Sequence, residues 1–467
     1  MKQLVWFRHD LRVADNPALS AAREQAEVVA CFVVSEAQWR SHDVGDRRLA
    51  FLNRCVQALA VELAQLGIPL RILHVPWFRD VPEALIALLR REQCAHLHFN
   101  AEYPLNELNR DRAVARRCSR EAIGWTRHHG SVVHAPGSLT TGSGGAYSVF
   151  TPFRNRWLAA LAPGMLDPLP VPGAQASGPA AVSVDWPLNV EDDCAEDWPG
   201  GERQAQRRLH DFLDAHAGDY GEQRDYPGVS GTSRLSAYLS VGALSPRQCL
   251  HALTRREPIE ESSFATELIW REFYRHVVVA FPHVCRGEAF HRQYDSVRWE
   301  HAPDQLAAWQ AGETGYPLVD AGMRQLRTTG WMHNRLRMVT AMFLSKHLLI
   351  DWREGERYFM QQLVDGDFAA NNGGWQWSAS TGTDAAPYFR IFNPASQGQR
   401  FDAKGVFTRQ WVPELAAVPD KWLFEPWKAG GVTGYPSPVV EHAFARQRAI
   451  ERFRGVGDAG TAGNKRA

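Results

Sequence analysis

The hydrophobic and polar positions of the first hundred residues alternate between short strand patterns and longer helical patterns. The strand patterns are runs of β-branched and aromatic residues that recur at intervals of roughly 30 residues. Strands that alternate with helices in this way predict βαβ units, and therefore a doubly wound parallel sheet in an α/β domain. The predicted strands are 3–7, 28–34, 69–75 and 95–100.

From about residue 203 onward the strand patterns fade, and apolar residues recur at the three- and four-residue intervals of helices. Clear examples are 207–217, 265–280 and 332–349. The sequence therefore predicts a Rossmann-like α/β domain at 1–130, followed by a mostly α-helical domain at 203–467.

The intervening residues, 131–202, have the composition of a connector. From 161 to 201 they are rich in Ala, Pro and Gly, and residues 191–202 include six acidic residues and no basic one. Because so few apolar residues could anchor a core element there, we expect an interdomain connector.

Composition narrows the class of protein. The 467-residue chain has 52 basic and 52 acidic residues, so its net charge indicates no particular partner, although a local basic surface is enough to bind DNA phosphates. Its seven cysteines are scattered without a C-x-x-C pair, which argues against a disulfide framework and a zinc site. The first residues are charged where a signal peptide is apolar, and no apolar run reaches membrane-spanning length. We expect a cytoplasmic protein without membrane contact.

The first candidate site is in the segment 219–246. Residues 231–234 (Gly-Thr-Ser-Arg) precede a helical run, and N–H groups, hydroxyls and a cation at a helix start suit a pyrophosphate. The alternative is an ordinary N-cap turn with a surface arginine. No G-x-G-x-x-G follows the first predicted strand, so the sheet itself is not the expected nucleotide site.

A second candidate is the helical segment 267–276. Glu267, Trp270 and Arg271 are three and four residues apart, so they share one helix face. They either line a cavity in which a carboxylate accepts hydrogen bonds from a base edge, or form a plain ion pair beside an indole.

The third candidate, 330–338, is basic. Asn334 and Met338 share a helix face, with Arg335 and Arg337 beside them. A basic strip next to apolar residues suits phosphates and bases, whereas the alternative is a solvated charged face.

The fourth candidate, 365–394, is the most distinctive. Two asparagines, two glycines and two tryptophans occur within residues 371–377, a composition that gives up helix stability. Trp375 and Trp377 are two residues apart and therefore point to nearly opposite sides of a helix.

These segments closely resemble those of the DNA photolyase and cryptochrome family. The similarity is carried by GTSRLSAYLSVGALSPRQCL, ELIWREFYRH, TGYPLVDAGMRQLRTTGWMHNRLRM and NNGGWQWSASTGTDAAPYFRIFNP, and it covers essentially the whole chain. Within the family the chain is most similar to bacterial class I cyclobutane-dimer photolyases. The resemblance implies an N-terminal antenna domain and a helical domain that binds FAD, with the reduced, anionic flavin as the active form.

The resemblance also implies which residues contact FAD. Asn371 matches the residue that faces flavin N5, where an amide supports a reduced flavin. Arg337 and Asp365 match an ion pair at the flavin edge, and Phe264 stands where close relatives have a tryptophan. The implied cofactor-binding residues are Tyr220, Thr232, Ser233, Arg234, Leu235, Ser236, Phe264, Arg337, Asp365, Gly366, Asp367 and Asn371.

Other matches concern the DNA lesion and the path of electrons. Glu267 and Asn334 match residues that hydrogen-bond the bases of the dimer, and Glu267 is the main candidate to stabilise its radical anion. Trp375, Trp352 and Trp299 match a relay that carries electrons from the surface to the flavin. The implied DNA-binding residues are Arg224, Glu267, Trp270, Arg271, Asn334, Arg335, Met338 and Trp377.

The implied antenna is a folate, 5,10-methenyltetrahydrofolate. Its binding residues would be His42, Asn106, Glu107, Cys285 and Arg286. Arg286 replaces the lysine of close relatives, which preserves the charge but not the shape.

The resulting expectation is a lyase that repairs cyclobutane pyrimidine dimers in UV-damaged DNA, driven by blue or near-UV light. The lesion would be flipped out of the duplex, and the enzyme would act as a monomer without an obligate protein partner. The main alternative is a cryptochrome photoreceptor. A (6-4) photolyase is less favoured because Asn334 and Met338 stand where that chemistry uses histidines.

Overall fold

The computed structural model describes residues 2–176 and 182–463. Its contacts divide the chain into two compact units. The first, the α/β unit, comprises residues 1–218, 233–282 and 364–367. The second, the helical unit, comprises 219–232, 283–363 and 368–467.

The α/β unit is built on a five-stranded sheet in which every neighbouring pair is parallel. The strand order is β3-β2-β1-β4-β5, so the predicted doubly wound parallel sheet is confirmed. The sequence missed the fifth strand because its residues alternate between half-buried and exposed and form no apolar run. The strands are β1 (Lys2–Phe7), β2 (Val28–Val34), β3 (Leu70–His74), β4 (Cys94–Asn100) and β5 (Gly124–His128).

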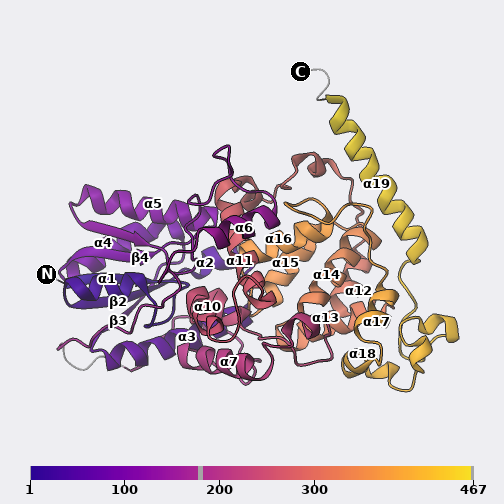
Figure 1. Ribbon diagram of the computed structural model, residues 1–467, viewed down its shortest axis with the longest axis horizontal. Coiled ribbons are helices and arrows are strands. Elements are labelled where there is room, and N and C mark those ends of the chain that lie inside the picture. Colours follow the sequence, from indigo (N-terminus) through magenta and orange to yellow (C-terminus); the bar gives the residue numbers. More distant parts are fainter. Residues whose placement is uncertain (1, 177–181, 464–467) are drawn as a thin grey trace. The chain divides into compact units, whose positions relative to one another are not determined.

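Helices cover the two faces of this sheet (Figure 1). Leu4 and Trp6, on one face of β1, share an apolar core with α4 (Val81–Arg91) and α5 (Leu105–Arg120). The remaining helices of this half of the chain are α1 (Pro17–Gln25), α2 (Glu36–Arg40) and α3 (Asp46–Gln65), with η1 (Phe78–Asp80) preceding α4.

Helices from beyond the sheet also belong to the α/β unit, and buried hydrogen bonds explain why. The guanidinium of Arg12, in the loop after β1, donates to the carbonyls of Asp15, Gly130 and Gly242. Because a buried guanidinium needs such partners, the loop and the later helices stay together. These helices are α6 (Phe150–Ala159), α7 (Glu202–Ala215), α9 (Ser236–Val241), α10 (Pro246–Thr254) and α11 (Ser263–Ala280).

Glu272 of α11 holds the start of the predicted connector. Its carboxylate accepts hydrogen bonds from the backbone N–H groups of Val133 and His134 and from the indole of Trp157, at 2.6–2.9 Å. Burial raises the pKa of Glu272 to about 7. Among its described residues the connector contains α6 and the first residue of α7, and those from 161 to 201 form no helix or strand. The domain boundaries expected from the sequence remain predictions.

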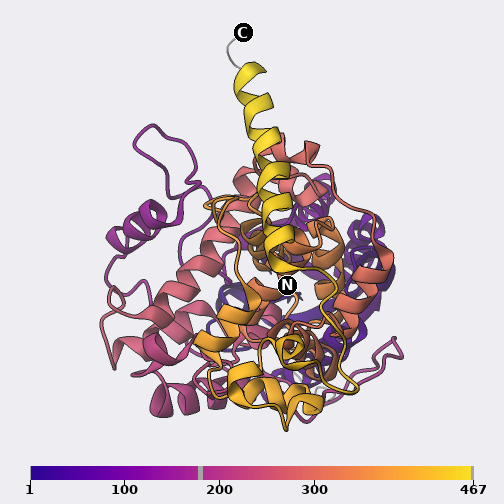
Figure 2. The ribbon, with the colours of Figure 1, turned by 90° about the vertical axis from the view of Figure 1, so that its right-hand side faces the viewer.

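The helical unit packs its helices around an aromatic core that includes Trp309, Trp352 and Trp375. The last helix, α19, is a single long helix, seen end to end in Figure 1 and from a second side in Figure 2. The helices of this unit are α8 (Tyr220–Gln223), α12 (Pro303–Ala311), α13 (Pro317–Thr329), α14 (Asn334–Met342), α15 (Trp352–Gln362), α16 (Phe368–Ala379), α17 (Pro394–Phe401), α18 (Val406–Trp411) and α19 (His442–Gly463).

The predicted helix 332–349 is interrupted. It is α-helical from Asn334 to Met342 and continues as a π-helical turn, η4 (Phe343–His347). That turn places Lys346 in the core, where its Nζ lies 3.3 Å from the ring centroid of Phe453. Burial lowers the pKa of Lys346 well below its ordinary value.

None of the helices in the described part of the chain combines the length and the apolar composition that a bilayer crossing requires. Nor do the described residues include a group of three or more His, Cys, Asp or Glu side chains placed to hold a metal ion.

Candidate functional site

The α/β unit contains the end of the predicted phosphate-binding segment, Ser233 to Ser236. Arg234 has a left-handed backbone (φ +50°), which turns the chain immediately before α9. The N–H of Leu235 donates to Ser233 Oγ at 3.4 Å, and the Arg234 guanidinium lies 5.0 Å from the ring centroid of Trp198. The structure thus holds a hydroxyl and a cation together at this helix start.

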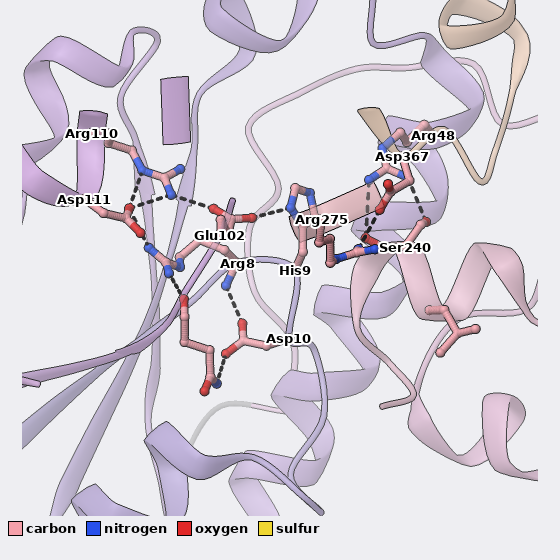
Figure 3. A network of polar contacts seen from close by, with 12 residues as sticks. Arg8, His9, Asp10, Arg48, Glu102, Arg110, Asp111, Ser240, Arg275 and Asp367 are labelled. Carbon is pink, nitrogen blue, oxygen red and sulfur yellow. Dashed lines mark hydrogen bonds and ion pairs between the residues drawn. The ribbon is translucent and has the colours of Figure 1, made fainter. Parts of the chain in front are cut away.

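The same unit places polar groups around Asp367 (Figure 3). Arg275 of α11 forms an ion pair with Asp367 at 2.7 Å. Arg48 of α3 is buried and donates to Ser240 Oγ at 2.8 Å. Burial lowers the pKa of Arg48, whereas the carboxylates of Asp367 and Asp365 oppose that shift. Sequence reasoning did not identify Arg48 or Arg275, although Arg275 follows Arg271 by one helical turn.

A denser network fills the carboxyl ends of β1 and β4, where the strand order reverses (Figure 3). Arg110 forms ion pairs with Glu102 at 2.5 Å and Asp111 at 2.8 Å, and Arg8 pairs with Asp111 at 3.1 Å. His9 also contacts Glu102. Open α/β sheets usually bind ligands at such a switch point. Here the chain's own ion pairs cross it, and that the nucleotide binds outside the sheet stays a prediction.

Part of the predicted antenna site is assembled within the α/β unit. The side chains of Asn106, on α5, and His42, which follows α2, are 2.8 Å apart. The Gln38 amide lies at the same distance from His42. Burial, assisted by Glu102, raises the pKa of Glu107 on the next position of α5. Cys285 and Arg286 lie in η2 (Pro282–Arg286), and Arg286 is exposed.

The α11 residues predicted to contact DNA are anchored to other parts of the α/β unit. Trp270 stacks face to face on Phe150, with ring centroids 3.6 Å apart and an angle of 9°. Arg271 donates to the carbonyls of Ser131 at 2.9 Å and Leu239 at 2.8 Å. Burial lowers the pKa of Arg271 to about 9. This geometry favours a structural role for Arg271, and a DNA contact by it remains only a prediction.

The α/β unit also contains the predicted site residues Phe264, Glu267 and Gly366. Phe264 is buried and packs on Phe212 of α7, with ring centroids 4.8 Å apart, so an aromatic side chain is kept at this position. Glu267 lies half-buried on α11, and Gly366 is buried between Asp365 and Asp367 in the sequence.

In the helical unit the basic strip begins at α14. Asn334 is the exposed first residue of this helix, and Met338 lies half-buried one turn later. Arg335 forms an ion pair with Asp225 at 2.7 Å and lies over the ring of Phe401 at 4.4 Å. A DNA phosphate at Arg335 would therefore compete with the Asp225 carboxylate.

The helical unit also contains four further predicted residues, Arg337, Tyr220, Arg224 and Thr232. Arg337 Nε donates to the carbonyl of Met332 at 2.8 Å. Tyr220 begins α8, and the Arg224 guanidinium lies 5.5 Å from its ring centroid. Thr232 is half-buried.

The predicted tryptophan relay lies in the aromatic core of the helical unit. Trp375 and Trp352 are buried in the core, and Trp299 is half-buried against it, so the set runs from the interior outward. Sequence reasoning did not identify Trp309, whose ring meets Trp375 edge to face at 6.0 Å. A tryptophan on an apolar helix face predicts packing in the core whether or not the residue has a further role. No local sequence signal could therefore have singled out Trp309.

The helix α16 presents its two tryptophans differently, as their spacing predicted. Trp375 is 2% exposed, whereas Trp377 is half-buried. Asn371 of this helix donates through Nδ2 to the carbonyl of Glu356 at 3.0 Å. Gly355 of α15 lies against Trp375 so closely that a Cβ there would come within 2.1 Å of the indole. A side chain at 355 would therefore displace Trp375.

Comparison with known proteins gives matches to both halves of the chain. Residues 3–173 match a family model described as DNA photolyase, and residues 264–455 match one described as the FAD binding domain of DNA photolyase. The chain is 47% identical to a deoxyribodipyrimidine photo-lyase of Escherichia coli, over 96% of this chain and 98% of the relative.

Solved structures show the same similarity in three dimensions. A bacterial class III photolyase from Agrobacterium tumefaciens superposes with a TM-score of 0.89 at 35% identity, covering 98% of each chain. An archaeal photolyase from Sulfolobus tokodaii, solved with two FAD molecules, superposes with a TM-score of 0.82 at 30% identity, covering 97% of this chain and all of the other.

Proposed function

The chain belongs to the DNA photolyase family, and from this premise we infer that it is a deoxyribodipyrimidine photo-lyase, which repairs cyclobutane pyrimidine dimers in DNA under light. The observation that carries the inference is the 47% identity over nearly the full length of a protein with that name. UV-damaged DNA is then its substrate.

FAD is the cofactor that the matched FAD-binding domain implies. When bound, reduced and illuminated, it supplies the electron that opens the dimer. We propose that Ser233 and Arg234 bind its phosphates and that Asp365 and Asp367 hold its polar edge. The ion pair of Asp367 with Arg275 supports this, since it fixes the orientation of the Asp367 carboxylate. Asn371, oriented by its bond to Glu356, is proposed to donate to the flavin ring.

The proposed lesion contacts come from α11, α14 and α16. Glu267 and Asn334 bind the base edges, and Trp270, Met338 and Trp377 contact the flipped bases. The stacking of Trp270 on Phe150 supports the proposal that Trp270 forms a wall of the lesion-binding site, because it fixes the plane of the indole before DNA binds. Arg224 and Arg335 bind phosphates, with Asp225 holding Arg335 until a phosphate replaces it.

The test is illumination of the purified protein with DNA that contains one defined lesion, followed by measurement of restored thymines. We expect repair of cyclobutane dimers and none of (6-4) products, because Asn334 and Met338 provide no histidine. Glu267→Ala should lower repair yield more than DNA affinity. Repair confined to (6-4) products would contradict the proposal that cyclobutane dimers are the substrate. Light-dependent changes of the flavin without any repair would indicate a cryptochrome.

The antenna is proposed to be a folate at His42, Asn106, Glu107, Cys285 and Arg286. The contact between His42 and Asn106 supports a preformed part of that site. Because Arg286 is exposed and replaces a lysine, we expect folate to be bound below one equivalent and to be lost easily. Near-UV absorbance of the freshly purified protein above that of FAD alone would support a bound folate, and extraction of FAD alone would contradict it.

That the protein is a monomer remains a prediction.

A further inference from the structure

A second basic and aromatic surface lies on α5 and the edge strand β5 of the α/β unit. Arg112, Arg116 and Arg120 are one helical turn apart on the exposed face of α5. Trp125 of β5 stands beside them, and a surface hollow of about 380 Å³ lies between these side chains. We call it the α5–β5 hollow. Its lining residues are Arg112, Ala115, Arg116, Ser119, Arg120 and Trp125.

The three arginines of the hollow differ from the other basic residues of α5. Arg110 and Arg117 each form ion pairs with two carboxylates. Arg112, Arg116 and Arg120 form no ion pair with any residue in 2–176 or 182–463. Like charges four residues apart repel one another along a helix. The stripe therefore costs stability unless an anion lies against it.

Trp125 is held in place although it is 40% exposed. Its Nε1 donates to Ser119 Oγ at 3.1 Å, and Ser119 in turn donates to the carbonyl of Ala115 at 3.0 Å. The indole also stacks on Phe99 of β4, with ring centroids 6.4 Å apart and planes at 20°. An exposed aromatic ring with a fixed orientation is suited to stacking with another flat ring.

We propose that the α5–β5 hollow binds a short stretch of undamaged single-stranded DNA. The arginines extend over about 12 Å of helix axis, from eight residues at about 1.5 Å each, which is more than one phosphate group can span. Several phosphates in succession match this row of charges. Stacking on Trp125 requires an unpaired base, because the base faces of a duplex are covered by their neighbours. An acidic peptide would match the arginines but not the indole.

This inference goes beyond the proposed function, because the ligand is undamaged and binding needs no light. The experiment measures, in the dark, the fluorescence anisotropy of a labelled oligothymidylate about twelve nucleotides long. The protein carries Arg335→Ala, which weakens the proposed lesion site. In this background Arg112→Gln/Arg116→Gln/Arg120→Gln should make the salt dependence of binding shallower by about two, at about 0.7 per phosphate. Trp125→Ala should weaken binding about tenfold.

Matched controls remove the same groups elsewhere. Arg298→Gln/Arg446→Gln/Arg454→Gln removes three other exposed arginines, and Trp77→Ala removes another exposed tryptophan. Both should leave binding close to that of the background protein. Trp125→Phe should retain most of the affinity, because it keeps a ring for stacking. Melting temperature and FAD content show that each variant is folded, and if the triple variant does not fold, Arg116→Gln alone should still make the salt dependence shallower.

Three results would overturn the proposal. The first is an equal salt dependence in the α5 triple variant and its control. The second is tighter binding of an RNA of the same length, which would exclude DNA as the ligand. The third is equal binding of polyglutamate that is insensitive to Trp125→Ala, which would mark a general anion surface.

Discussion

The α/β unit and the helical unit both bury cationic side chains, but the neighbours of these side chains differ. In the α/β unit Arg8, Arg12 and Arg110 are buried, and each has carboxylate or carbonyl partners. In the helical unit, Lys346 Nζ is buried without a hydrogen-bond partner among the residues that the structure describes. The neighbour of Lys346 is the ring of Phe453 instead, and the rings of Trp309 and Trp375 in the same unit are in edge contact.

This difference suggests different roles for the two units. Buried charges that are fully paired fix the positions of the loops that carry them, and so make the unit rigid. An aromatic core whose rings are in edge contact has polarisable groups in succession, and these are the side chains that can lose and regain an electron. From this contrast we expect electron transfer to run through the helical unit and the α/β unit to provide structural order.

Trp299→Phe should have the largest effect, because phenylalanine is much harder to oxidise than tryptophan. We expect it to abolish light-driven reduction of oxidised flavin while repair by chemically pre-reduced enzyme persists. The measurement is flavin absorbance under illumination with a reductant, beside a repair assay. Trp411→Phe is the control, since Trp411 also packs on the aromatic core without belonging to the relay. Equal losses of photoreduction and of pre-reduced repair would contradict separate electron routes.

Glu272→Ala tests whether buried, hydrogen-bonded charges stabilise the α/β unit. Removing the carboxylate leaves two backbone N–H groups and the Trp157 indole without their acceptor. We expect the free energy of unfolding to fall by about 3 kcal/mol, measured by urea denaturation. Glu272→Gln keeps one acceptor oxygen and should lose less. A loss below that of an exposed substitution such as Glu24→Ala would show that the network is dispensable.

Much of the fold could be predicted from the sequence, because secondary structure follows local patterns of residues. The four N-terminal strands and the helix 265–280 follow from periodicity, whereas the tryptophan relay is implied by motif similarity and stays a prediction. The fifth strand was missed because β5 lies at the sheet edge, where half-buried residues give no apolar run.

The partners of the charged residues could not be predicted. Arg271 shares a helix face with Glu267, yet it donates to carbonyls 140 and 32 positions away in the sequence. Hydrogen bonds over such separations depend on tertiary packing, which periodicity does not report. For the same reason Arg48, Arg275 and Trp309 were found only in the structure.

Asp225→Asn sharpens the comparison by breaking an ion pair of the helical unit. Asp225 neutralises Arg335 at a partly exposed position, so its removal should free the guanidinium for DNA. We expect a severalfold gain in affinity for dimer-containing DNA, and Arg335→Ala should lose affinity and make the salt slope shallower by about one. Filter binding over a range of salt concentrations measures both. No change on either substitution would remove Arg335 from the DNA contacts.

Glu62→Gln should have the smallest effect, and it depends on pH. Burial, with Glu202 nearby, raises the pKa of Glu62 to about 7 from an ordinary 4.5. The folded protein therefore binds this proton more tightly, and Glu62 lowers stability as pH rises from about 4.5 to 7. Because Glu62 is only half-buried and water screens its charge, the variant should gain about 1 kcal/mol over the parent at pH 8, less than the full shift implies, and little at pH 4.5, by urea denaturation. A gain of equal size at both pH values would contradict the assigned cause.

The bonds of the loop after β1 also have a consequence for how the protein is made. Arg12 needs the carbonyl of Gly242, and the buried carboxylate of Asp15 pairs with Arg247 at 2.7 Å. On the ribosome these partners emerge about 120 residues after the last strand of the sheet, a delay on the order of ten seconds at typical rates of synthesis. During that interval Arg12 and Asp15 lack these partners and stay in contact with water, so final closure of this loop waits for the helices that follow.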